Sequence, residues 1–170
     1  MSQPDQNDKA ELHSPHRFVT KIDTPFLSYI RTHQMPAFQT QTPKPAFEDL
    51  QQTPEAVLID CRTRAEWVYV GVPLLPETGA KTAFIEWVDT AGMPNPEFLG
   101  QVSRVAGPRT PLYLLCRSGV RSAAACQFLA ESGFETLVNI AEGFEGDVGS
   151  NGQRASINGW KFNGLPWAQR

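Results

Sequence analysis

The chain has 170 residues, 41% of them hydrophobic and 19% charged, and its formal net charge is −3. This length and composition predict one globular domain with a tail, large enough for one sizeable hydrophobic core. A mildly acidic chain is a poor partner for nucleic acid, because phosphate binding needs a basic surface. No apolar run approaches the roughly 18 residues of a membrane span, and the polar N-terminus lacks the apolar core of a signal peptide, so we expect a cytoplasmic protein that binds no membrane.

The cysteines and histidines bear on redox and metal chemistry. There are three cysteines and no Cys-x-x-Cys pair, so we expect no disulfide framework and a reducing compartment. The histidines, His13, His16 and His33, all lie in the first fifth of the chain and far from the cysteines. Neither a Cys/His metal site nor a Cys–His catalytic pair is therefore expected, and we expect no metal and no cofactor.

The N-terminal part differs from the rest of the chain. Residues 1–16 are polar and predict a disordered tail. Residues 17–45 predict an N-terminal extension that ends in a proline-rich linker, with Pro36, Pro43 and Pro45 among glutamines and threonines. The main domain is expected over residues 46–168.

Short apolar runs then alternate with helix-like segments. Strands are predicted over 56–59, 82–87, 111–115 and 136–140. Helices are predicted over 47–52, 63–70, 96–105 and 120–132. Thr63, with Glu66 three residues later, is a helix-capping signature, and Gly133 follows the last helix as a C-cap. Strands that alternate with helices imply an α/β protein with a parallel sheet covered on both faces.

The strand over 111–115 runs directly into a short loop, Cys116-Arg117-Ser118-Gly119-Val120-Arg121, and then into a helix. Ligands bind at the carboxyl ends of such strands. A helix N-terminus with free backbone N–H groups forms an anion site, and the same field lowers the pKa of a cysteine held there.

The side chains of this loop suit an anion as well. The guanidinium groups of Arg117 and Arg121 match an oxyanion, and Gly119 permits a tight backbone turn. Ser122 either caps the helix or donates to the sulfur. The alternative is that Cys116 is an inert buried thiol, but such a thiol needs neither the arginines nor the glycine.

Three segments in order resemble the single-domain rhodanese-like proteins. Residues 116–122, Cys-Arg-Ser-Gly-Val-Arg-Ser, resemble the active-site loop of that family, and residues 58–67 resemble its strand, Asp-x-Arg turn and helix ending in Glu and an aromatic. Residues 139–146, with Asn-Gly-Trp at 158–160 and Gly-Leu-Pro-Trp at 164–167, resemble its C-terminal part. The resemblance implies a rhodanese-like three-layer α/β fold with a central five-stranded parallel sheet flanked by helices.

The resemblance also implies a sulfurtransferase with a double-displacement reaction. Cys116 takes a sulfane sulfur from a donor such as thiosulfate as a persulfide, and a thiophilic acceptor, either a small molecule or a protein thiol, then removes it. We expect Cys116 as the nucleophile and a monomer or weak homodimer. The substrate-binding residues are expected to be Arg117, Ser118, Gly119, Val120, Arg121 and Ser122. The segment over 70–80 is longer than the family's Gly-His-Ile-Pro-Gly-Ala turn, which leaves donor and acceptor preference open.

Two other function classes share these features. Cysteine-dependent phosphatases and arsenate reductases use a similar loop, but with five residues between cysteine and arginine, where this chain has four. They also need a general acid, and nothing in the sequence places Asp60 or Asp147 beside a leaving group. A non-catalytic binding module of the same fold usually lacks the cysteine, although fold alone does not exclude it.

Residues after the first predicted strand have supporting roles in this interpretation. Asp60 and Arg62 are expected to brace the loop from a neighbouring strand end, the alternative being an ordinary turn salt bridge. Glu66 is expected to pair with Arg62 one helical turn away. Cys61 either resolves or relays the sulfur of Cys116, or points into the core beside an outward Asp60.

Overall fold

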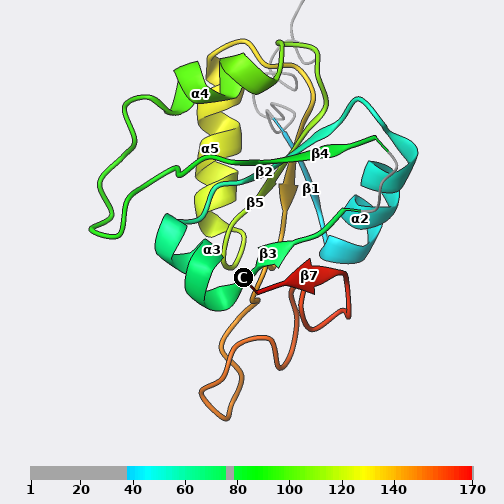
Figure 1. The fold of residues 1–170 in the computed structure, drawn as a ribbon, viewed down its shortest axis with the longest axis vertical. Coiled ribbons are helices and arrows are strands. Elements are labelled where there is room, and N and C mark those ends of the chain that lie inside the picture. The colour runs from blue at the N-terminus through cyan, green and yellow to red at the C-terminus, as the bar shows by residue number, and fades with distance from the viewer. Residues whose placement is uncertain (1–37, 76–78, 170) are drawn as a thin grey trace, which may run out of the picture. The chain divides into compact units, whose positions relative to one another are not determined.

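The computed structural model describes residues 38–75 and 79–169, so the tail expected over 1–16 lies outside the described residues. The described part is built on a sheet of five parallel strands, in the order β1-β6-β5-β2-β4 (Figure 1). The strands are β1 (Gln39–Gln41), β2 (Val57–Asp60), β4 (Lys81–Phe84), β5 (Leu112–Leu115) and β6 (Leu137–Ile140). The predicted α/β fold with a five-stranded parallel sheet is confirmed.

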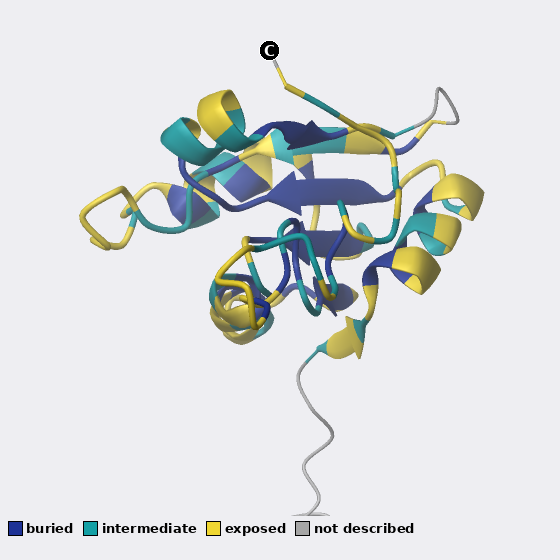
Figure 2. Ribbon diagram, turned by 90° about the horizontal axis from the view of Figure 1, so that it is seen from below, coloured by how far each residue is buried: buried dark blue, intermediate teal, exposed yellow. Residues whose placement is uncertain are grey.

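Four helices accompany the sheet in the described ranges: α2 (Pro43–Gln52), α3 (Arg64–Val70), α4 (Phe98–Val105) and α5 (Val120–Glu131). One face of the sheet packs against α4 and α5, whose Phe98, Val102 and Leu129 join its buried cluster. The other face packs against α2, through Ala46 and Leu50. Figure 2 shows the central strands buried while the helices expose their outer sides. None of these helices is long and apolar enough to cross a membrane.

The chain beyond the sheet is tied down by a small two-stranded ribbon. Strand β3 (Val72–Pro73) follows α3, and it pairs antiparallel with β7 (Trp167–Ala168) near the C-terminus. Helix α3 ends at Gly71, whose φ of 101° lies in the region that favours glycine. The predicted capping box is present, because the Thr63 side chain accepts from the Glu66 backbone while the Glu66 side chain accepts from the Thr63 backbone.

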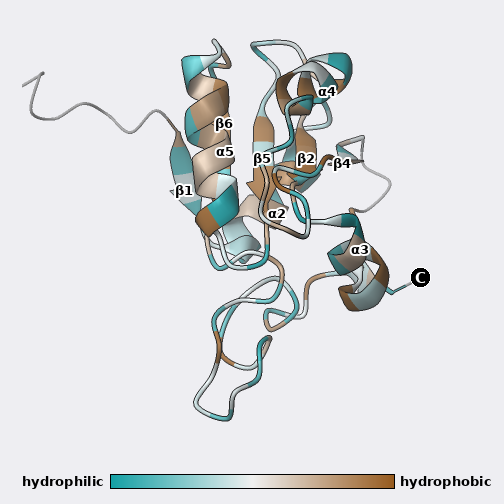
Figure 3. Cartoon of the chain, turned by 90° about the vertical axis from the view of Figure 1, so that its left-hand side faces the viewer, coloured by the Kyte–Doolittle hydropathy of each residue, from teal (hydrophilic) through white to brown (hydrophobic). Residues whose placement is uncertain are grey.

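The linker predicted over 17–45 differs from the structure in its last residues. Residues 39–41 form the edge strand β1, paired with β6, and α2 already begins at Pro43, so the domain start expected at 46 falls inside this helix. Proline is tolerated in the first helical turn because its missing N–H has no partner there. Strand β1 has the sequence Gln-Thr-Gln, and Figure 3 shows it in the colour of hydrophilic residues. The sequence did not predict this strand, because it has no alternation of apolar and polar residues.

Side chains on the central strands alternate between the two buried faces. Val57, Ile59 and Cys61 lie on the α4/α5 side, whereas Leu58 lies on the other side. Strand β5 alternates in the same way and places Cys116 on the α4/α5 side. Because β2 and β5 are paired neighbours, the two cysteines follow the ends of adjacent strands, and both side chains lie on the same face of the sheet.

Candidate active site

The candidate nucleophile sits where β5 gives way to α5. Cys116 is the first residue after the strand, and Gly119 forms the N-cap of the helix with φ 88°. A Cβ atom at position 119 would also lie 3.1 Å from the backbone nitrogen of Glu142. The loop therefore needs glycine at this position, and the turn directs the first amides of α5 toward the cysteine.

Several donors converge on the sulfur of Cys116. The backbone N–H of Gly119 donates to Sγ over 3.1 Å, and the Ser122 hydroxyl lies 3.2 Å from it. The backbone amides of Ser118 and Ser122 add to the effect of these donors and help to lower the pKa of this thiol. Ser122 is not a helix cap, and of the two roles left open for its hydroxyl, the contact with the sulfur is present.

This environment favours a thiolate. Donation from the Cys61 side chain, followed by donation from Ser122 and the loop amides, outweighs the opposing effect of burial and lowers the pKa of Cys116 to about 5. Hydrogen bonds to the charged form of a group favour that form. At neutral pH Cys116 is therefore held as the nucleophilic form, even though the residue is only 1% exposed.

A second turn, after β6, holds the loop from behind. The backbone N–H of Phe144 donates to the Cys116 carbonyl over 2.7 Å, and the N–H groups of Glu145 and Gly146 donate to the Arg117 carbonyl. Gly143 has φ 62°, and a Cβ atom there would collide with the backbone of Cys116 and Arg117. The glycine-rich turn thus fixes the position of the loop by direct backbone contact.

Arg121 makes an ion pair that the sequence did not predict. Its guanidinium donates to both carboxylate oxygens of Glu66 on α3, over 2.8 and 2.6 Å. Burial alone would raise the pKa of Glu66, but donation from Arg121 and from Thr63 lowers it to about 2. The predicted Glu66–Arg62 pair is wrong, because the Arg62 side chain is fully buried and takes a different carboxylate.

That carboxylate belongs to Asp60, and the pair is fully buried. Arg62 contacts both Asp60 oxygens, the shortest distance being 2.6 Å, and also donates to the Gly71 carbonyl over 2.8 Å. Its guanidinium carbon lies 4.0 Å from the centre of the Phe144 ring. The backbone N–H of Phe144 donates to the Cys116 carbonyl, so Asp60 and Arg62 support the turn that holds the loop. Because both side chains are fully buried, this pair is not an exposed turn salt bridge.

An open cavity of about 480 Å³ lies outside the loop. Its lining includes Arg117 and Arg121 from the loop region and, from the far C-terminal loop, Glu145 and Arg154. No ion pair joins Arg117 or Arg154 to a carboxylate in the part of the chain that the structure describes. Arg154 was missed by sequence reasoning, since it lies in an irregular loop more than thirty residues after Cys116 and carries no motif.

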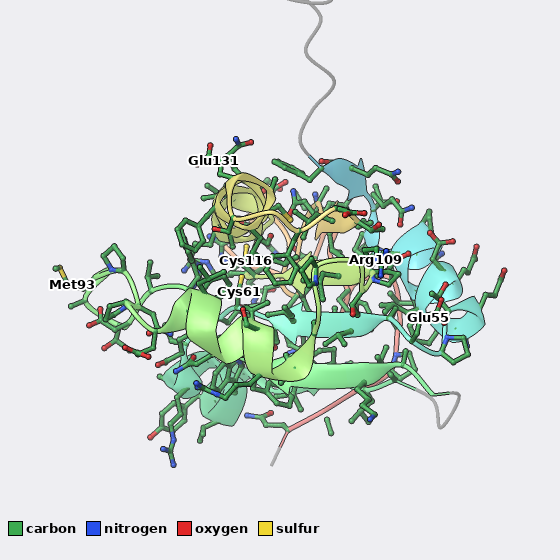
Figure 4. All side chains as sticks on the ribbon, turned by 90° about the horizontal axis from the view of Figure 1, so that it is seen from above. Glu55, Cys61, Met93, Arg109, Cys116 and Glu131 are labelled. Carbon is green, nitrogen blue, oxygen red and sulfur yellow. The ribbon has the colours of Figure 1, made fainter. Side chains whose placement is uncertain are left out.

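Cys61 lies beside Cys116, at the end of the neighbouring strand; both residues are labelled in Figure 4. Its backbone N–H donates to the Leu115 carbonyl over 2.8 Å, and its side chain shares one buried cluster with Cys116. Of the two alternatives left open for Cys61, its burial in the core is observed, but Asp60 is buried as well and not outward. Val120, by contrast, is 75% exposed, so this loop residue is not part of the buried set around the sulfur.

A metal centre is not supported in the described ranges, where no group of three or more histidine, cysteine, aspartate or glutamate side chains could hold an ion. The donors around Sγ are N–H, S–H and O–H groups, which suit an anion and not a cation. The arrangement can ionise a buried thiol, hold an additional anionic atom at the helix N-terminus, and admit a ligand of moderate size through an arginine-lined cavity.

Comparison with known proteins gives consistent matches. An uncharacterized protein of Rickettsia conorii is 36% identical over 124 residues, which are 72% of this chain and 90% of that protein. Thiosulfate sulfurtransferase GlpE of Haemophilus influenzae is 30% identical over 110 residues, which are 65% and 88% of the two chains. The crystal structure of Rv0390 from M. tuberculosis matches with a TM-score of 0.72 and 39% identity, over 78% and 98% of the two chains.

The family model described as the Rhodanese-like domain matches residues 44–149, more than half of the chain. Its first matched residue, 44, lies in α2, one residue after the start of that helix. The five-stranded sheet, the loop at Cys116 and this match agree with one another, and the chain belongs to the rhodanese-like domain family.

Proposed function

We propose that this protein is a sulfurtransferase that moves a sulfane sulfur from a donor such as thiosulfate to a thiophilic acceptor through a persulfide on Cys116. The Cys116 thiolate attacks the outer sulfur of the donor, the bond between the donor's two sulfurs breaks, and the donor leaves as an oxyanion. A second thiophile then attacks the outer sulfur of the persulfide and regenerates the thiolate.

The observation that carries this proposal is the set of donors around Sγ. A free thiolate and a persulfide anion each carry one negative charge, so the same N–H and O–H groups serve both states. The amides of Ser118, Gly119 and Ser122 come from the loop and the first turn of α5, where the helix dipole adds to their field. A pKa of about 5 keeps Cys116 reactive at neutral pH.

The charged side chains of the cavity suggest how the donor is oriented. Both terminal nitrogens of the Arg121 guanidinium donate to the Glu66 carboxylate, so the positive charge of Arg121 is largely neutralised. Arg117 and Arg154 face the same cavity without a carboxylate partner among residues 38–75 and 79–169. We assign the donor's oxyanion to Arg117, assisted by Arg154, and assign Arg121 to holding α3 against the loop.

The partners follow from this chemistry. The donor and acceptor are small molecules, or the acceptor is a protein thiol, and the reaction uses neither nucleic acid nor a membrane. A reduced thiol suits the cytoplasm, where glutathione and thioredoxin systems keep cysteines reduced. We propose a monomer or weak homodimer as the working form.

Thiosulfate:cyanide turnover tests the proposal. Wild type and Cys126→Ser are expected to be active, because Cys126 is buried in α5 and makes no hydrogen bond with the loop, while Cys116→Ser is expected to be inactive. Mass spectrometry of wild type with thiosulfate alone should show a gain of one sulfur atom. If nothing turns over and wild type hydrolyses an aryl phosphate, the phosphatase alternative replaces this proposal. If wild type neither turns over nor forms a persulfide, the binding-module alternative replaces this proposal.

The role of the arginine is tested by Arg117→Gln, with Arg104→Gln as a matched control in α4. Arg104 lines a different cavity, formed mainly by residues around the start of β2 and the end of α4. Arg117→Gln is expected to raise KM for thiosulfate about tenfold, since a charge-assisted contact contributes about 1.5–3 kcal/mol. Arg104→Gln should leave KM unchanged, and equal effects in the two variants would contradict the assignment.

A further inference from the structure

The structure contains a second buried thiol within reach of the first, and the proposed transfer reaction does not use it. Strands β2 and β5 are paired in register, with Asp60 opposite Leu115, so that Cys61 and Cys116 are the next residues on both strands. Alternation along the strands sends both side chains to the same face. Cys61 is fully buried and Cys116 almost so.

We propose that Cys61 is a resolving cysteine that discharges the Cys116 persulfide when no acceptor is present, which gives the protein a sulfide-releasing activity. The inference rests on the proposed function, because it needs the persulfide as its substrate. Cys61 Sγ attacks Cys116 Sγ, the bond from Cys116 Sγ to the outer sulfur breaks, and a Cys61–Cys116 disulfide forms.

The step balances without an external oxidant. The Cys61 thiol gives its proton to the leaving sulfur, and the electron pair of the broken bond goes with that sulfur, which departs as hydrosulfide. The sulfane sulfur is reduced to sulfide, and the two cysteines are oxidised to the disulfide. A dithiol reductant then restores both thiols by ordinary thiol–disulfide exchange.

The geometry of neighbouring strands suits the bond. Adjacent strands lie about 4.8 Å apart, and disulfides join residues whose Cα atoms are about 4.4–6.8 Å apart. The register of the two strands already places both thiols side by side in one buried cluster, so the bond needs no rearrangement of the sheet. Cys61 reaches Cys116 from β2, whereas the amide donors that would hold the outer sulfur belong to the loop and α5. The nucleophile and the leaving sulfur are therefore held by different elements of the fold.

Burial sets the speed of the step. Loss of solvation, reinforced by the neighbouring Cys116, raises the pKa of Cys61 well above its ordinary value. The thiolate is the attacking form, so discharge is slow compared with transfer to an acceptor that enters from the cavity. The outer sulfur of the persulfide is therefore transferred to an acceptor where one is present. Cys61 discharges the persulfide only when no acceptor has removed that sulfur.

The third cysteine provides the matched control. Cys126 is also fully buried in the same apolar cluster, but it lies on α5 and affects Cys116 only through charge, without a hydrogen bond. Removing Cys126 therefore changes the cysteine content of the same core without removing the resolving thiol. Cys61→Ser keeps a similar volume and a hydrogen-bond donor beside Cys116.

The experiment loads the full chain with thiosulfate, removes the excess, and follows intact mass and released sulfide without acceptor. Wild type and Cys126→Ser should first gain one sulfur atom, then lose it as sulfide and end two hydrogen atoms lighter than the reduced chain. A cross-linked peptide should contain both Cys61 and Cys116. Cys61→Ser should take up the sulfur but release no sulfide in the absence of acceptor.

Two results would overturn this inference alone: a wild-type persulfide that lasts as long as that of Cys61→Ser, or sulfide release without the disulfide. A wild-type chain that takes no sulfur overturns the proposed function and this inference together. Where Cys61→Ser does not fold, the wild-type chain alone still decides, because a persulfide that persists without acceptor also contradicts the inference.

Discussion

Ser122 offers the sharpest test of the thiolate at Cys116. Its side chain is fully buried, and its hydroxyl lies 3.2 Å from Sγ. Replacing it by alanine removes one donor from the sulfur and leaves the backbone amides in place. The pKa of Cys116, about 5 in the wild type, should therefore rise.

The size of the rise follows from the contacts of the hydroxyl. A hydrogen bond to a charged group contributes about 1.5–3 kcal/mol, and one pKa unit corresponds to about 1.4 kcal/mol. The single hydroxyl proton is shared, however, because Oγ also lies 2.6 Å from Asn139 Oδ1 and 3.1 Å from the Gly119 carbonyl. We therefore expect the lower figure, about one unit, which moves the pKa of Cys116 to about 6.

Alkylation by iodoacetamide as a function of pH measures this shift. At pH 5 the thiolate fraction should fall from about one half to about one tenth, and the rate about fivefold, while the rates converge above pH 8. Cys126 does not interfere, because burial raises its pKa to about 12. The control is Ser132→Ala, at the other end of α5, where the hydroxyl donates to the Phe128 carbonyl. An unchanged midpoint for Ser122→Ala would refute the reasoning.

Three further predictions concern the supports of the loop. Glu66→Gln should cost about 1 kcal/mol of stability at neutral pH in urea unfolding, since the ion pair is partly exposed. Because the folded-state pKa of Glu66 is lowered to about 2, that difference should vanish as pH falls from about 4.5 to about 2. Asp60→Asn should cost about 3–5 kcal/mol in the same assay, because it leaves the buried Arg62 guanidinium without its counter-charge. Gly143→Ala should slow persulfide loading more than Gly152→Ala, which has a similar positive φ but open space around it; equal loading would contradict a role for the collision.

Much of the fold could be predicted because its signals are local. The apolar runs of β2, β5 and β6 are buried on both faces, and a run of that kind has few structural alternatives. The capping box of α3 needs only Thr63 and its third neighbour. The loop at Cys116 could likewise be placed, since a strand, a glycine turn and a helix follow one another within a few residues.

The rest could not be predicted because it depends on distant partners. Strand β1 owes its place to pairing with β6 almost a hundred residues later and not to its own hydrophilic side chains. Glu66 has Arg62 one turn away in sequence, yet it pairs with Arg121, which lies 55 residues further along the chain. Arg154 reaches the cavity only because its loop folds back toward the site. Side-chain partners of this kind are set by topology.

The two carboxylates that could have served a phosphatase are both engaged elsewhere. Asp60 is fully buried and held by Arg62, and Asp147 is exposed and accepts from the Asn158 side chain. Neither is a free acid for a leaving group, and the engagement of Arg121 by Glu66 leaves less positive charge for a doubly charged phosphoryl group. We therefore expect wild type to hydrolyse an aryl phosphate no faster than Cys116→Ser does, with release of the phenol as the readout. Cysteine-dependent hydrolysis would show that an acid from another part of the chain completes the site.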